Sequence, residues 1–377
     1  MKAKNRIGIV GGGQLGRMLG IAAKQMGFWV GVTDPTPRSP AGQVVDYQIV
    51  ADYNDEAAIR KLAGKVDFLT FEIELANAKI LDELSAAGVM INPSAKTLEV
   101  IKDKLKQKRF LKKAKIPTAD FVEVTTKSDV EKAANKFGYP LLLKARMDAY
   151  DGRGNVLIKK AGDIGVGLIK LSGRKLYVEK LVPFKKELAV MVARSLSGEI
   201  VAYPVVETIH EDNICHTVIA PATVSMAVAK KAGTLAKKVM QKLKGAGIFG
   251  IEMFLSKDNK VLVNEIAPRV HNSGHYTIEG CVTNQFAQHI RAITGMPLGE
   301  SQMVTGAAVM VNILGDRLGR AKVENLSGVL QLPNVSVHIY GKYETKPQRK
   351  MGHITVVGDN VEDTFDLAKR AREMIFI

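Results

Sequence analysis

The sequence gathers chemically capable side chains in one short stretch, NEIAPRVHNSGHYT, which covers residues 264–277. An apolar run of strand character leads directly into the carboxylate of Glu265, and Arg269, His271 and His275 follow within ten residues. Carboxylates, guanidinium groups and imidazoles bind metal ions, hold anions and move protons. We therefore expect a reaction site or a metal site at the end of this strand.

A second carboxylate is expected directly opposite Glu265. The segment FGIEMFLSKDNKVLVNEIA predicts two antiparallel strands joined by a two-residue turn at 258–259, where Asp and Asn tolerate positive φ. If Lys257 pairs with Lys260, counting outward places Glu252 opposite Glu265 on the same face. Like charges about 5 Å apart destabilise a sheet, and a divalent cation removes that penalty. Oxygen ligands beside phosphates favour Mg²⁺, or else Mn²⁺, over zinc. The alternative is a pair of glutamates on a solvated face.

The histidines of the same stretch do not suit a zinc site. The i, i+4 spacing of His271 and His275 brings two ligands together only on a helix, whereas Pro268 and the Asn-Ser-Gly turn at 272–274 predict a loop. Arg269 suits a planar anion, because its forked guanidinium matches paired oxygens. For each histidine, a structural hydrogen-bonding role stays open beside a catalytic one.

Several features upstream are typical of a nucleoside triphosphate site. The apolar run YPLLLKA ends in Lys144, and the glycine-rich segment AYDGRGN follows at 149–155. Such a loop supplies backbone N–H groups and a positive charge, so it can close over phosphates, although it is neither a Walker A motif nor a kinase loop. The extended stretch 179–182 can present its backbone to an adenine, and Glu187 can hold ribose hydroxyls.

The first glycine loop, GIVGGGQLGRM, matches a dinucleotide-binding fingerprint. Gly11, Gly13 and Gly16 lie between an expected strand and helix, and Asp34 ends the next strand, where an acid would hold a ribose hydroxyl. Nothing downstream suggests hydride transfer, however. We therefore expect these glycines to let strand and helix pack closely, and we do not expect NAD to bind.

Hydrophobic patterning predicts the elements that would position these residues. Residues 6–93 alternate short apolar strands with helical patterns, which predicts a parallel α/β sheet with helices on both faces. A lysine-rich helix over 94–114 ends before Pro117. The expected divisions are a Rossmann-like domain at 1–114, a lid subdomain at 115–186, a core with the metal site at 187–300, and a small C-terminal domain at 301–377.

Composition and charge limit the classes of function. The 377 residues are 46% hydrophobic and 24% charged, as in an ordinary globular protein, and no apolar run is long enough to cross a membrane. Two cysteines without CxxC spacing, and no signal peptide, predict a reduced, cytoplasmic protein. The net charge is +16, yet the densest basic run, 102–115, has apolar residues at helical spacing, so its lysines are expected on a solvated face. We therefore expect no nucleic-acid partner and an anionic substrate.

Four segments that occur in order, GGGQLGRM, FEIE, YDGRGN and NEIAPRVHNSGHYT, resemble the N5-carboxyaminoimidazole ribonucleotide synthetase family of the ATP-grasp superfamily. The resemblance covers nearly the whole chain. It implies an α/β ATP-grasp fold with an N-terminal Rossmann-like (pre-ATP-grasp) domain and a small C-terminal domain. It also implies a homodimeric, magnesium-dependent ligase of purine biosynthesis, which uses ATP and bicarbonate to carboxylate 5-aminoimidazole ribonucleotide through carboxyphosphate.

The resemblance assigns roles to individual residues of this sequence. The catalytic residues would be Asp151, Arg153, Arg269 and His271, with Asp151 or His271 accepting or orienting the proton of the attacking amine. ATP would be bound by Lys104, Lys144, Ala149, Tyr150, Gly152, Gly154, Asn155, Glu179, Lys180, Leu181, Val182, Glu187, His210 and Asn264. The second substrate would contact Glu74, Tyr150, Asp151, Arg153, Asn272, Ser273, Lys342 and Arg349, and the metal ligands would be Glu252 and Glu265.

The tail YGKYETKPQRKMGH departs from the family pattern. Tyr343 is an insertion, Lys346 replaces an arginine and Gln348 replaces a glycine. Lys342 and Arg349 still bracket a proline turn, so the resemblance implies that these two cations bind the 5′-phosphate of the substrate.

Two other classes of function stay open on the sequence. A formate-dependent ribonucleotide transformylase would share the nucleotide site and differ in its co-substrate. A nucleotide-binding module without activity would carry the glutamate pair as structure only. Turnover with bicarbonate or with formate separates the three hypotheses.

Overall fold

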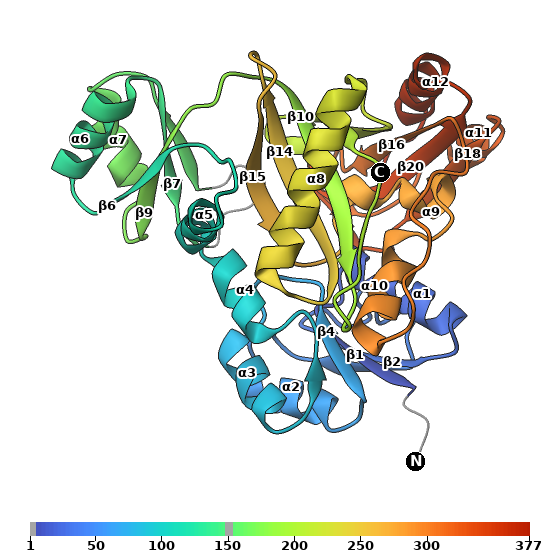
Figure 1. The fold of residues 1–377 in the computed structure, drawn as a ribbon. Helices are drawn as coiled ribbons and strands as arrows, with labels where there is room; N and C mark the ends of the chain where they lie inside the picture. Colours follow the sequence, from blue (N-terminus) through green and yellow to red (C-terminus); the bar gives the residue numbers. More distant parts are fainter. Residues whose placement is uncertain (1–4, 148–153) are drawn as a thin grey trace.

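The computed structural model describes residues 5–147 and 154–377 (Figure 1). Its N-terminal sheet is parallel, with the strand order β3-β2-β1-β4-β5. These strands are β1 (Arg6–Val10), β2 (Trp29–Asp34), β3 (Tyr47–Val50), β4 (Phe68–Phe71) and β5 (Met90–Ile91). Helix α1 (Gln14–Gln25) packs on one face, and α2 (Glu56–Ala63) and α3 (Ala78–Ala86) pack on the other. The predicted parallel sheet with helices on both faces is confirmed.

The predicted single helix over 94–114 is wrong, because the chain forms two helices there. These are α4 (Ala95–Lys102) and α5 (Lys104–Lys113). Asp103 between them has an extended backbone (φ −95°, ψ 106°), and its side chain accepts hydrogen bonds from the N–H groups of Leu105 and Lys106. An aspartate at this position caps the second helix and permits a change of direction. Lys104 is thereby placed in the first turn of α5.

A four-stranded antiparallel sheet, with the order β6-β9-β7-β8, forms a lobe beside α5 (Figure 1). Its strands are β6 (Phe121–Val124), β7 (Leu141–Ala145), β8 (Asn155–Ile158) and β9 (Leu176–Lys180). Helices α6 (Lys127–Phe137) and α7 (Asp163–Lys170) share one apolar core with this sheet. The lobe therefore has a hydrophobic core of its own.

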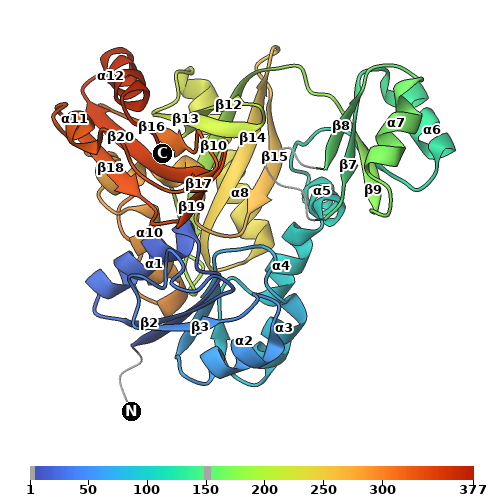
Figure 2. The same ribbon diagram turned by 180° about the vertical axis from the view of Figure 1, so that it is seen from behind.

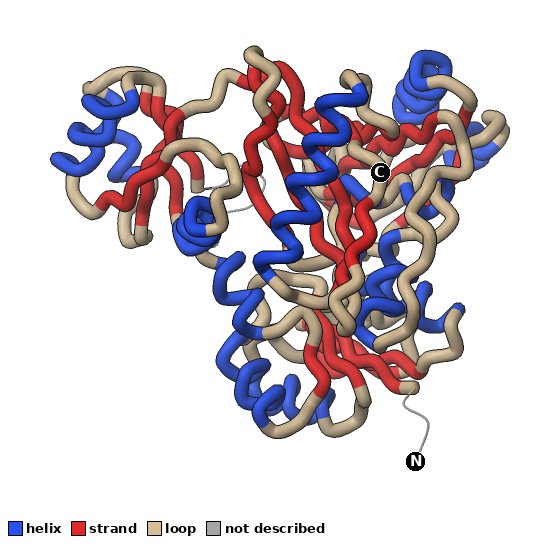
Figure 3. Tube along the Cα trace, viewed as in Figure 1, coloured by secondary structure: helices blue, strands red, loops and turns tan. Residues whose placement is uncertain are grey.

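The largest sheet has nine strands and runs in the order β15-β14-β10-β12-β13-β16-β20-β18, with β11 paired to β10. In Figure 3 its long strands, in red, lie beside the long blue helix at the centre of the molecule. Its bounds are β10 (Phe184–Arg194), β11 (Ile200–Ala202), β12 (Val206–Glu211), β13 (Ile214–Ala220), β14 (Gly247–Ser256), β15 (Val261–Ala267), β16 (Ala307–Leu314), β18 (Val335–Ile339) and β20 (Lys350–Gly358). Helix α8 (Met226–Leu243) shares an apolar core with one face of β10, β14 and β15, whereas α10 (Gln285–Thr294) packs against the other face. Strand β15 is an edge strand of this sheet.

The C-terminal strands continue this sheet without a break. Strand β13 pairs with β16 from Thr217 opposite Val311 to Ala220 opposite Ala308. Helix α12 (Val361–Glu373) covers β16 and β20 (Figure 2). The remaining short elements are the 3₁₀ turn at Asn272–Gly274, α9 (Thr277–Gly280), β17 (Gly319–Arg320), α11 (Leu326–Leu330) and β19 (Glu344–Thr345). Within the described part of the chain, no helix combines the length and apolar character that a membrane span requires.

Candidate active site

Glu252 on β14 faces Glu265 on β15, as the sequence predicts, but the turn that joins the strands is longer than predicted. The N–H of Ser256 donates to the carbonyl of Lys260 at 2.9 Å, so residues 257–259 form the turn. The left-handed residue at its end, Asn259, has φ 59°, which is typical of such three-residue hairpins. A bulge after Glu252 leaves Asn264 outside the pairing and restores the predicted register. The two-residue turn is therefore wrong and the carboxylate pair is right.

The ammonium of Lys104 contacts Glu265 Oε1 and lies 3.9 Å from Glu74 Oε2. Burial alone would raise the pKa of Glu265, but the charge and hydrogen bond of Lys104 lower it below its usual value. For Glu252, burial and the facing charge of Glu265 raise the pKa to about 7. Lys104 thus stabilises the charged form of Glu265, whereas at Glu252 burial and the facing carboxylate outweigh the nearby positive charges.

The donor set at this strand end fits a hard divalent cation such as Mg²⁺. Glu252 and Glu265 offer carboxylate oxygens, and half-buried Asn264 lies next to them on β15. In the described residues, no group of three or more His, Cys, Asp or Glu side chains gathers around a common point. A cation here would complete its shell with oxygens from water or phosphate, as Mg²⁺ usually does in nucleotide sites.

Two further lysines, Lys108 on α5 and Lys144 on β7, lie close to the carboxylate of Glu179. Glu179 Oε2 is 3.3 Å from Lys108 Nζ and 3.6 Å from Lys144 Nζ, and the Glu179 side chain is only 2% exposed. The side chain of Glu179 therefore holds two ammonium groups rather than facing a ligand. Lys108 was expected on a solvated helix face, and that prediction is wrong, because Lys108 is buried. Its i, i+4 spacing from Lys104 is the signal that could have revealed it.

The residues expected around the adenine and ribose lie where β9 passes into β10. Lys180 is exposed, and Leu181 and Val182 form a half-buried extended link. Glu187 on β10 and His210 on β12 lie close together, with 2.9 Å between Glu187 Oε2 and His210 Nδ1. Burial lowers the pKa of His210, but the carboxylate of Glu187 outweighs burial and raises it overall.

Only the end of the glycine-rich segment is described. Gly154 has φ 90° and its carbonyl accepts a hydrogen bond from the N–H of Ala145 at 2.8 Å, and Asn155 pairs with Lys144 across β7 and β8. This end of the segment is thus anchored beside Lys144. The predicted site residues Ala149, Tyr150, Asp151, Gly152 and Arg153 lie outside the described residues.

The loop after β15 brings Arg269 and His271 to the carboxylate pair. Arg269 Nη2 lies 3.1 Å from Glu74 Oε1. Among the described residues, the Nε atom of Arg269 is buried and has no hydrogen-bond partner. An N–H donor in that state is costly unless a ligand accepts from it. Glu74 therefore orients Arg269 while one donor of the guanidinium stays available.

His271 is held as a neutral imidazole. Its Nδ1 is 2.9 Å from the hydroxyl of buried Ser273, and its Nε2 is 3.5 Å from Glu252 Oε1. Burial, together with the charges of Arg269 and Lys350, lowers the pKa of His271 well below its ordinary value. The ring is therefore uncharged at neutral pH, and it can act as a hydrogen-bond donor at one nitrogen and an acceptor at the other.

The predicted substrate contact of Asn272 is not supported by its side chain. The amides of Asn272 and Asn312 bond to each other reciprocally, at 3.1 and 2.6 Å, and both residues are buried. The amide of Asn312 also donates to the carbonyl of Cys215 at 2.7 Å. Asn272 thus ties the loop after β15 to the C-terminal strand β16.

The first glycine loop is filled by the protein's own carboxylates. Glu72 accepts hydrogen bonds from Gly13 N at 2.7 Å and from Gly16 N at 3.2 Å, and Asp34 accepts from Gly12 N at 2.9 Å. A Cβ atom at Gly16 would lie 2.8 Å from the backbone carbonyl oxygen of Gly11, so a larger residue there would force the loop backbone to move. Asp34 thus braces the loop instead of facing a ribose, which supports the packing role over NAD binding.

The two tail cations make contacts within their own turn. Lys342 Nζ donates to the carbonyl of Lys350 at 2.6 Å, and Arg349 Nη1 donates to the carbonyl of Glu344 at 2.6 Å. Sequence reasoning missed Lys350, whose charge lowers the pKa of both His271 and His275 after the effect of burial. The charge of Lys350 thus acts on the loop after β15, and in the sequence only its position beside Arg349 hinted at this.

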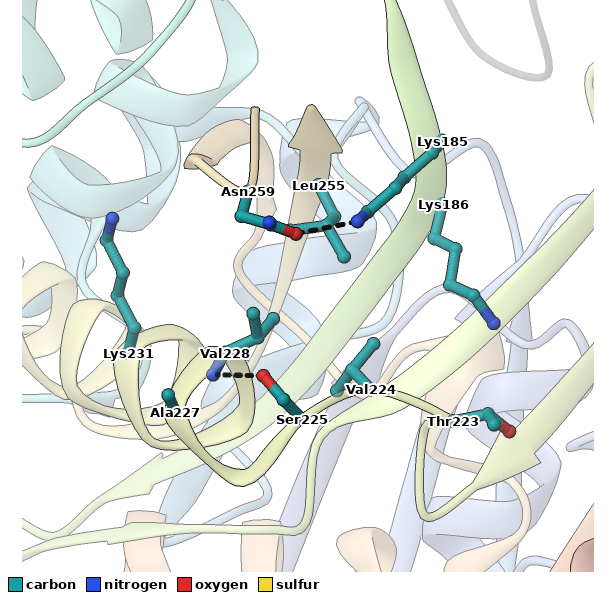
Figure 4. Close-up of a pocket in the computed structure, with 10 residues that line it drawn as sticks. All are labelled: Lys185, Lys186, Thr223, Val224, Ser225, Ala227, Val228, Lys231, Leu255 and Asn259. Carbon is teal, nitrogen blue, oxygen red and sulfur yellow. Dashed lines mark hydrogen bonds between the residues drawn. The ribbon is translucent and has the colours of Figure 1, made fainter. Parts of the chain in front are cut away.

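A cavity of about 610 Å³ lies away from these residues, at the first turn of α8 (Figure 4). Lys186 lines this cavity. Neighbouring residues of a strand point to opposite faces of the sheet, so the cavity opens on the face opposite to the site residue Glu187. Lys185 Nζ donates to Asn259 Oδ1 at 2.6 Å, and Lys186 Nζ is 2.6 Å from Glu207 Oε2. We do not include this cavity in the active site.

Family models match three successive parts of the chain. The matches are a ribonucleotide synthetase preATP-grasp domain at residues 4–102, an ATP-grasp domain at 109–286, and a phosphoribosylaminoimidazole carboxylase C-terminal domain at 308–366. The N5-carboxyaminoimidazole ribonucleotide synthase of Bacillus subtilis is 42% identical over 349 residues, which cover 93% of this chain and 90% of that protein. This chain belongs to the N5-carboxyaminoimidazole ribonucleotide synthase family.

Solved structures of N5-carboxyaminoimidazole ribonucleotide synthases share its fold. The Thermotoga maritima synthetase has a TM-score of 0.90 and 47% identity, over 99% of both chains. A synthase from Aspergillus clavatus, crystallised with ADP and 5-aminoimidazole ribonucleotide, has a TM-score of 0.90 and 38% identity over 98% of both chains. Fungal relatives named phosphoribosylaminoimidazole carboxylase are longer, and this chain spans 67% of the Ogataea methanolica protein and 64% of the Candida albicans protein. The ATP-grasp fold with its pre-ATP-grasp and C-terminal domains, and membership of a ligase family, are confirmed.

Proposed function

We propose that this protein carboxylates 5-aminoimidazole ribonucleotide to N5-carboxyaminoimidazole ribonucleotide in purine biosynthesis, using ATP and bicarbonate and releasing ADP and phosphate. The observation that carries the proposal is the position of Lys104, between the expected metal ligand Glu265 and the expected substrate residue Glu74. A nucleotide site and an acceptor site would therefore adjoin at Lys104. The Aspergillus clavatus complex with ADP and 5-aminoimidazole ribonucleotide supports the same pair of ligands.

The nucleotide half of the site neutralises phosphate charge. Lys104, Lys108 and Lys144 bring three ammonium groups together, and Glu179 keeps two of them in place. Glu252 and Glu265 would hold Mg²⁺, which when bound draws charge from the phosphates and favours ADP as the leaving group. Lys104 would then exchange its contact with Glu265 for a phosphate oxygen.

The acceptor half of the site would bind a planar anion and orient an amine. A bicarbonate oxygen attacks the γ-phosphorus, ADP leaves, and the amine nitrogen then attacks the carboxyl carbon of carboxyphosphate while phosphate leaves. The unpartnered Nε–H of Arg269 would donate to the carboxylate oxygens, with Glu74 fixing the guanidinium. Neutral His271 would orient the amine and receive its proton, because an uncharged imidazole can accept one.

The tail is proposed to bind the 5′-phosphate through Lys342 and Arg349, with Lys350 beside them. Arg349→Ala should raise the KM for the ribonucleotide at least about tenfold and the KM for ATP less than about twofold, because arginine binds phosphate with two donors. Lys346→Ala should do far less, since Lys346 is exposed and offers a point charge. Equal effects of Arg349→Ala on both KM values would place the phosphate elsewhere.

Phosphate release in three reaction mixtures tests the proposed function. The first holds ATP, Mg²⁺, bicarbonate and 5-aminoimidazole ribonucleotide; the second omits bicarbonate; the third holds formate and glycinamide ribonucleotide. Turnover is expected in the first mixture only. Robust turnover with formate would indicate a transformylase, and no turnover in any mixture would indicate a binding module. Omission of Mg²⁺, and light scattering for the proposed homodimer, complete the test.

A further inference from the structure

Two buried glutamines each hold the backbone of one residue in the loop-and-strand segment that carries the site chemistry. Gln107 on α5 is 1% exposed, and Gln285, the first residue of α10, is 0% exposed. Neither belongs to the proposed ligand or catalytic set. Each engages both the N–H and the C=O of a single residue, which is the pattern that a neighbouring strand would make.

Gln285 holds His271. Its Oε1 accepts a hydrogen bond from His271 N at 2.9 Å, and its Nε2 donates to His271 O at 2.8 Å. The same Nε2 lies 3.0 Å from Nδ1 of His275, and burial keeps His275 neutral by lowering its pKa to about 3. Because the amide of Gln285 is wholly buried, water cannot replace these bonds when the amide is removed.

Gln107 holds the residue that follows Glu265. Its Oε1 accepts from Ile266 N at 2.9 Å, and its Nε2 donates to Ile266 O at 3.2 Å. Strand β15 is an edge strand, so these groups have no further strand to pair with. Gln107 lies one turn after Lys104 on α5, and it therefore joins the helix that carries Lys104 to the strand that carries Glu265.

We propose that Gln107 and Gln285 are positioning residues that align the two halves of the site separately. Gln107 would set Glu265 and Lys104 for ATP and metal, and Gln285 would set His271 for the second substrate. A side-chain amide suits this task because it presents one acceptor and two donors in a plane. The proposal rests on the proposed function for its kinetic meaning, although the backbone contacts themselves do not depend on it.

The chain provides a matched control in Gln288, on the same helix as Gln285. Gln288 is also 0% exposed, and it bonds both the N–H and the C=O of Gly299, each at 2.7 Å. Gly299 lies in the segment after α10 and carries none of the proposed site residues. Replacing Gln288 therefore removes the same bonds from the fold without touching the site.

The experiment compares Gln107→Met, Gln285→Met and Gln288→Met, since methionine keeps a similar shape and removes the amide. Gln107→Met should raise the KM for ATP about tenfold and leave the KM for the ribonucleotide within about twofold, as expected for two lost backbone bonds. Gln285→Met should instead lower kcat or raise the KM for the ribonucleotide about tenfold, with the KM for ATP unchanged. Gln288→Met should lower Tm as the other two variants do, but it should change neither the KM for ATP nor the KM for the ribonucleotide.

Amide hydrogen exchange provides a readout that needs no turnover. Gln285→Met should speed exchange at His271 and not at Ile266, and Gln107→Met should do the reverse. A contrary outcome is that both variants lower Tm as Gln288→Met does while neither affects one substrate more than the other. In that case the glutamines only fill the core, and the proposal is overturned. Uniformly faster exchange over both segments would overturn it as well. If the wild-type enzyme shows no carboxylation, the proposed function fails. Hydrogen exchange still decides whether Gln107 and Gln285 hold their two segments separately.

Discussion

Glu252 and Glu265 face each other, and the ammonium of Lys104 contacts Glu265. Glu265→Gln should therefore abolish most turnover, with a loss of about hundredfold or more, because a metal ligand and the partner of Lys104 disappear together. Tm should change little, since the side chain is 35% exposed. Steady-state turnover with a thermal melt measures both quantities. Near-normal activity in Glu265→Gln would contradict the metal assignment, and Glu211→Gln, at an exposed position on β12, is the control.

Glu72 makes stability depend on pH through the glycine loop. Burial raises the pKa of Glu72 from 4.5 to about 7, although Gly13 and Gly16 donate to it. Because the folded-state pKa lies above the unfolded value, this contribution to stability is complete below pH 4.5 and is lost as pH rises toward 7. Its size is on the order of 3 kcal/mol at most. Glu72→Gln lacks this titration, so the Tm difference between wild type and Glu72→Gln should be larger at pH 5 than at pH 8.

A constant Tm difference across that range would show that Glu72 titrates normally. The measurement needs thermal melts at several pH values with matched ionic strength. Asp34, the other carboxylate of the loop, should be left intact in both proteins so that Gly12 keeps its acceptor.

Sequence alone could identify site residues that act through a charge at a strand end, but not those that act through the backbone. Glu252, Glu265 and Arg269 are visible as carboxylates and a guanidinium beside apolar runs. Gln107 and Gln285 are not, because an amide on a helix gives no sign of which distant residue it will contact.

At the scale of elements, the junction of α4 and α5 attaches the lobe to the site. Arg146, just after β7, forms a two-pronged contact with Asp103, at 3.2 Å from Nε and 2.5 Å from Nη2. Asp103→Asn should keep the helix cap, because asparagine also caps well, and lose the charge that holds Arg146. The KM for ATP should rise about tenfold, as expected for a buried charged hydrogen bond, and the KM for the ribonucleotide should not.

Steady-state kinetics with each substrate varied in turn measures this effect. Glu131→Gln, at an exposed i, i+4 pair with Lys127 on α6, is the matched control for a lost ion pair on the lobe. An unchanged KM for ATP in Asp103→Asn would mean that Arg146 does not hold the lobe in its working position.

The two strands of the carboxylate pair show how far pattern reasoning reaches. Alternation of apolar residues indicates both strands. Counting residues outward from the turn along the two strands then places Glu252 opposite Glu265. The count reached the correct pair from the wrong turn, because the bulge at Asn264 offsets the extra turn residue. Neither the bulge nor the cap at Asp103 breaks the hydrophobic pattern, so the pattern could not reveal them.

At the scale of the whole molecule, the nine-stranded sheet makes residues 301–377 part of the central fold. A chain ending at residue 300 would lose β16, β18 and β20, leaving β13 as an open edge and exposing apolar Ile219. We expect such a chain to be insoluble or to lack a cooperative thermal transition. A soluble 1–300 fragment with a sharp melt, observed by circular dichroism, would contradict this expectation.

The order of strands in that sheet was beyond sequence reasoning. Local patterns predict strands one by one, but between β13 and β16, which pair, the chain forms α8, β14, β15, α9 and α10. The parallel N-terminal sheet was easier, since its strands alternate regularly with helices.

Strand β15 also bears on how this protein avoids aggregation. An exposed edge strand is a template on which other chains add, and the outward backbone groups of β15 are already bonded at Val263 and Ile266. The carbonyl of Pro117 accepts from Val263 N and the hydroxyl of Thr118 donates to Val263 O, both at 2.8 Å, while Gln107 bonds Ile266. The contacts that align Glu265 therefore also block intermolecular strand addition. A partly unfolded chain whose α5 has detached would present β15 to its neighbours, so fibril growth should begin there.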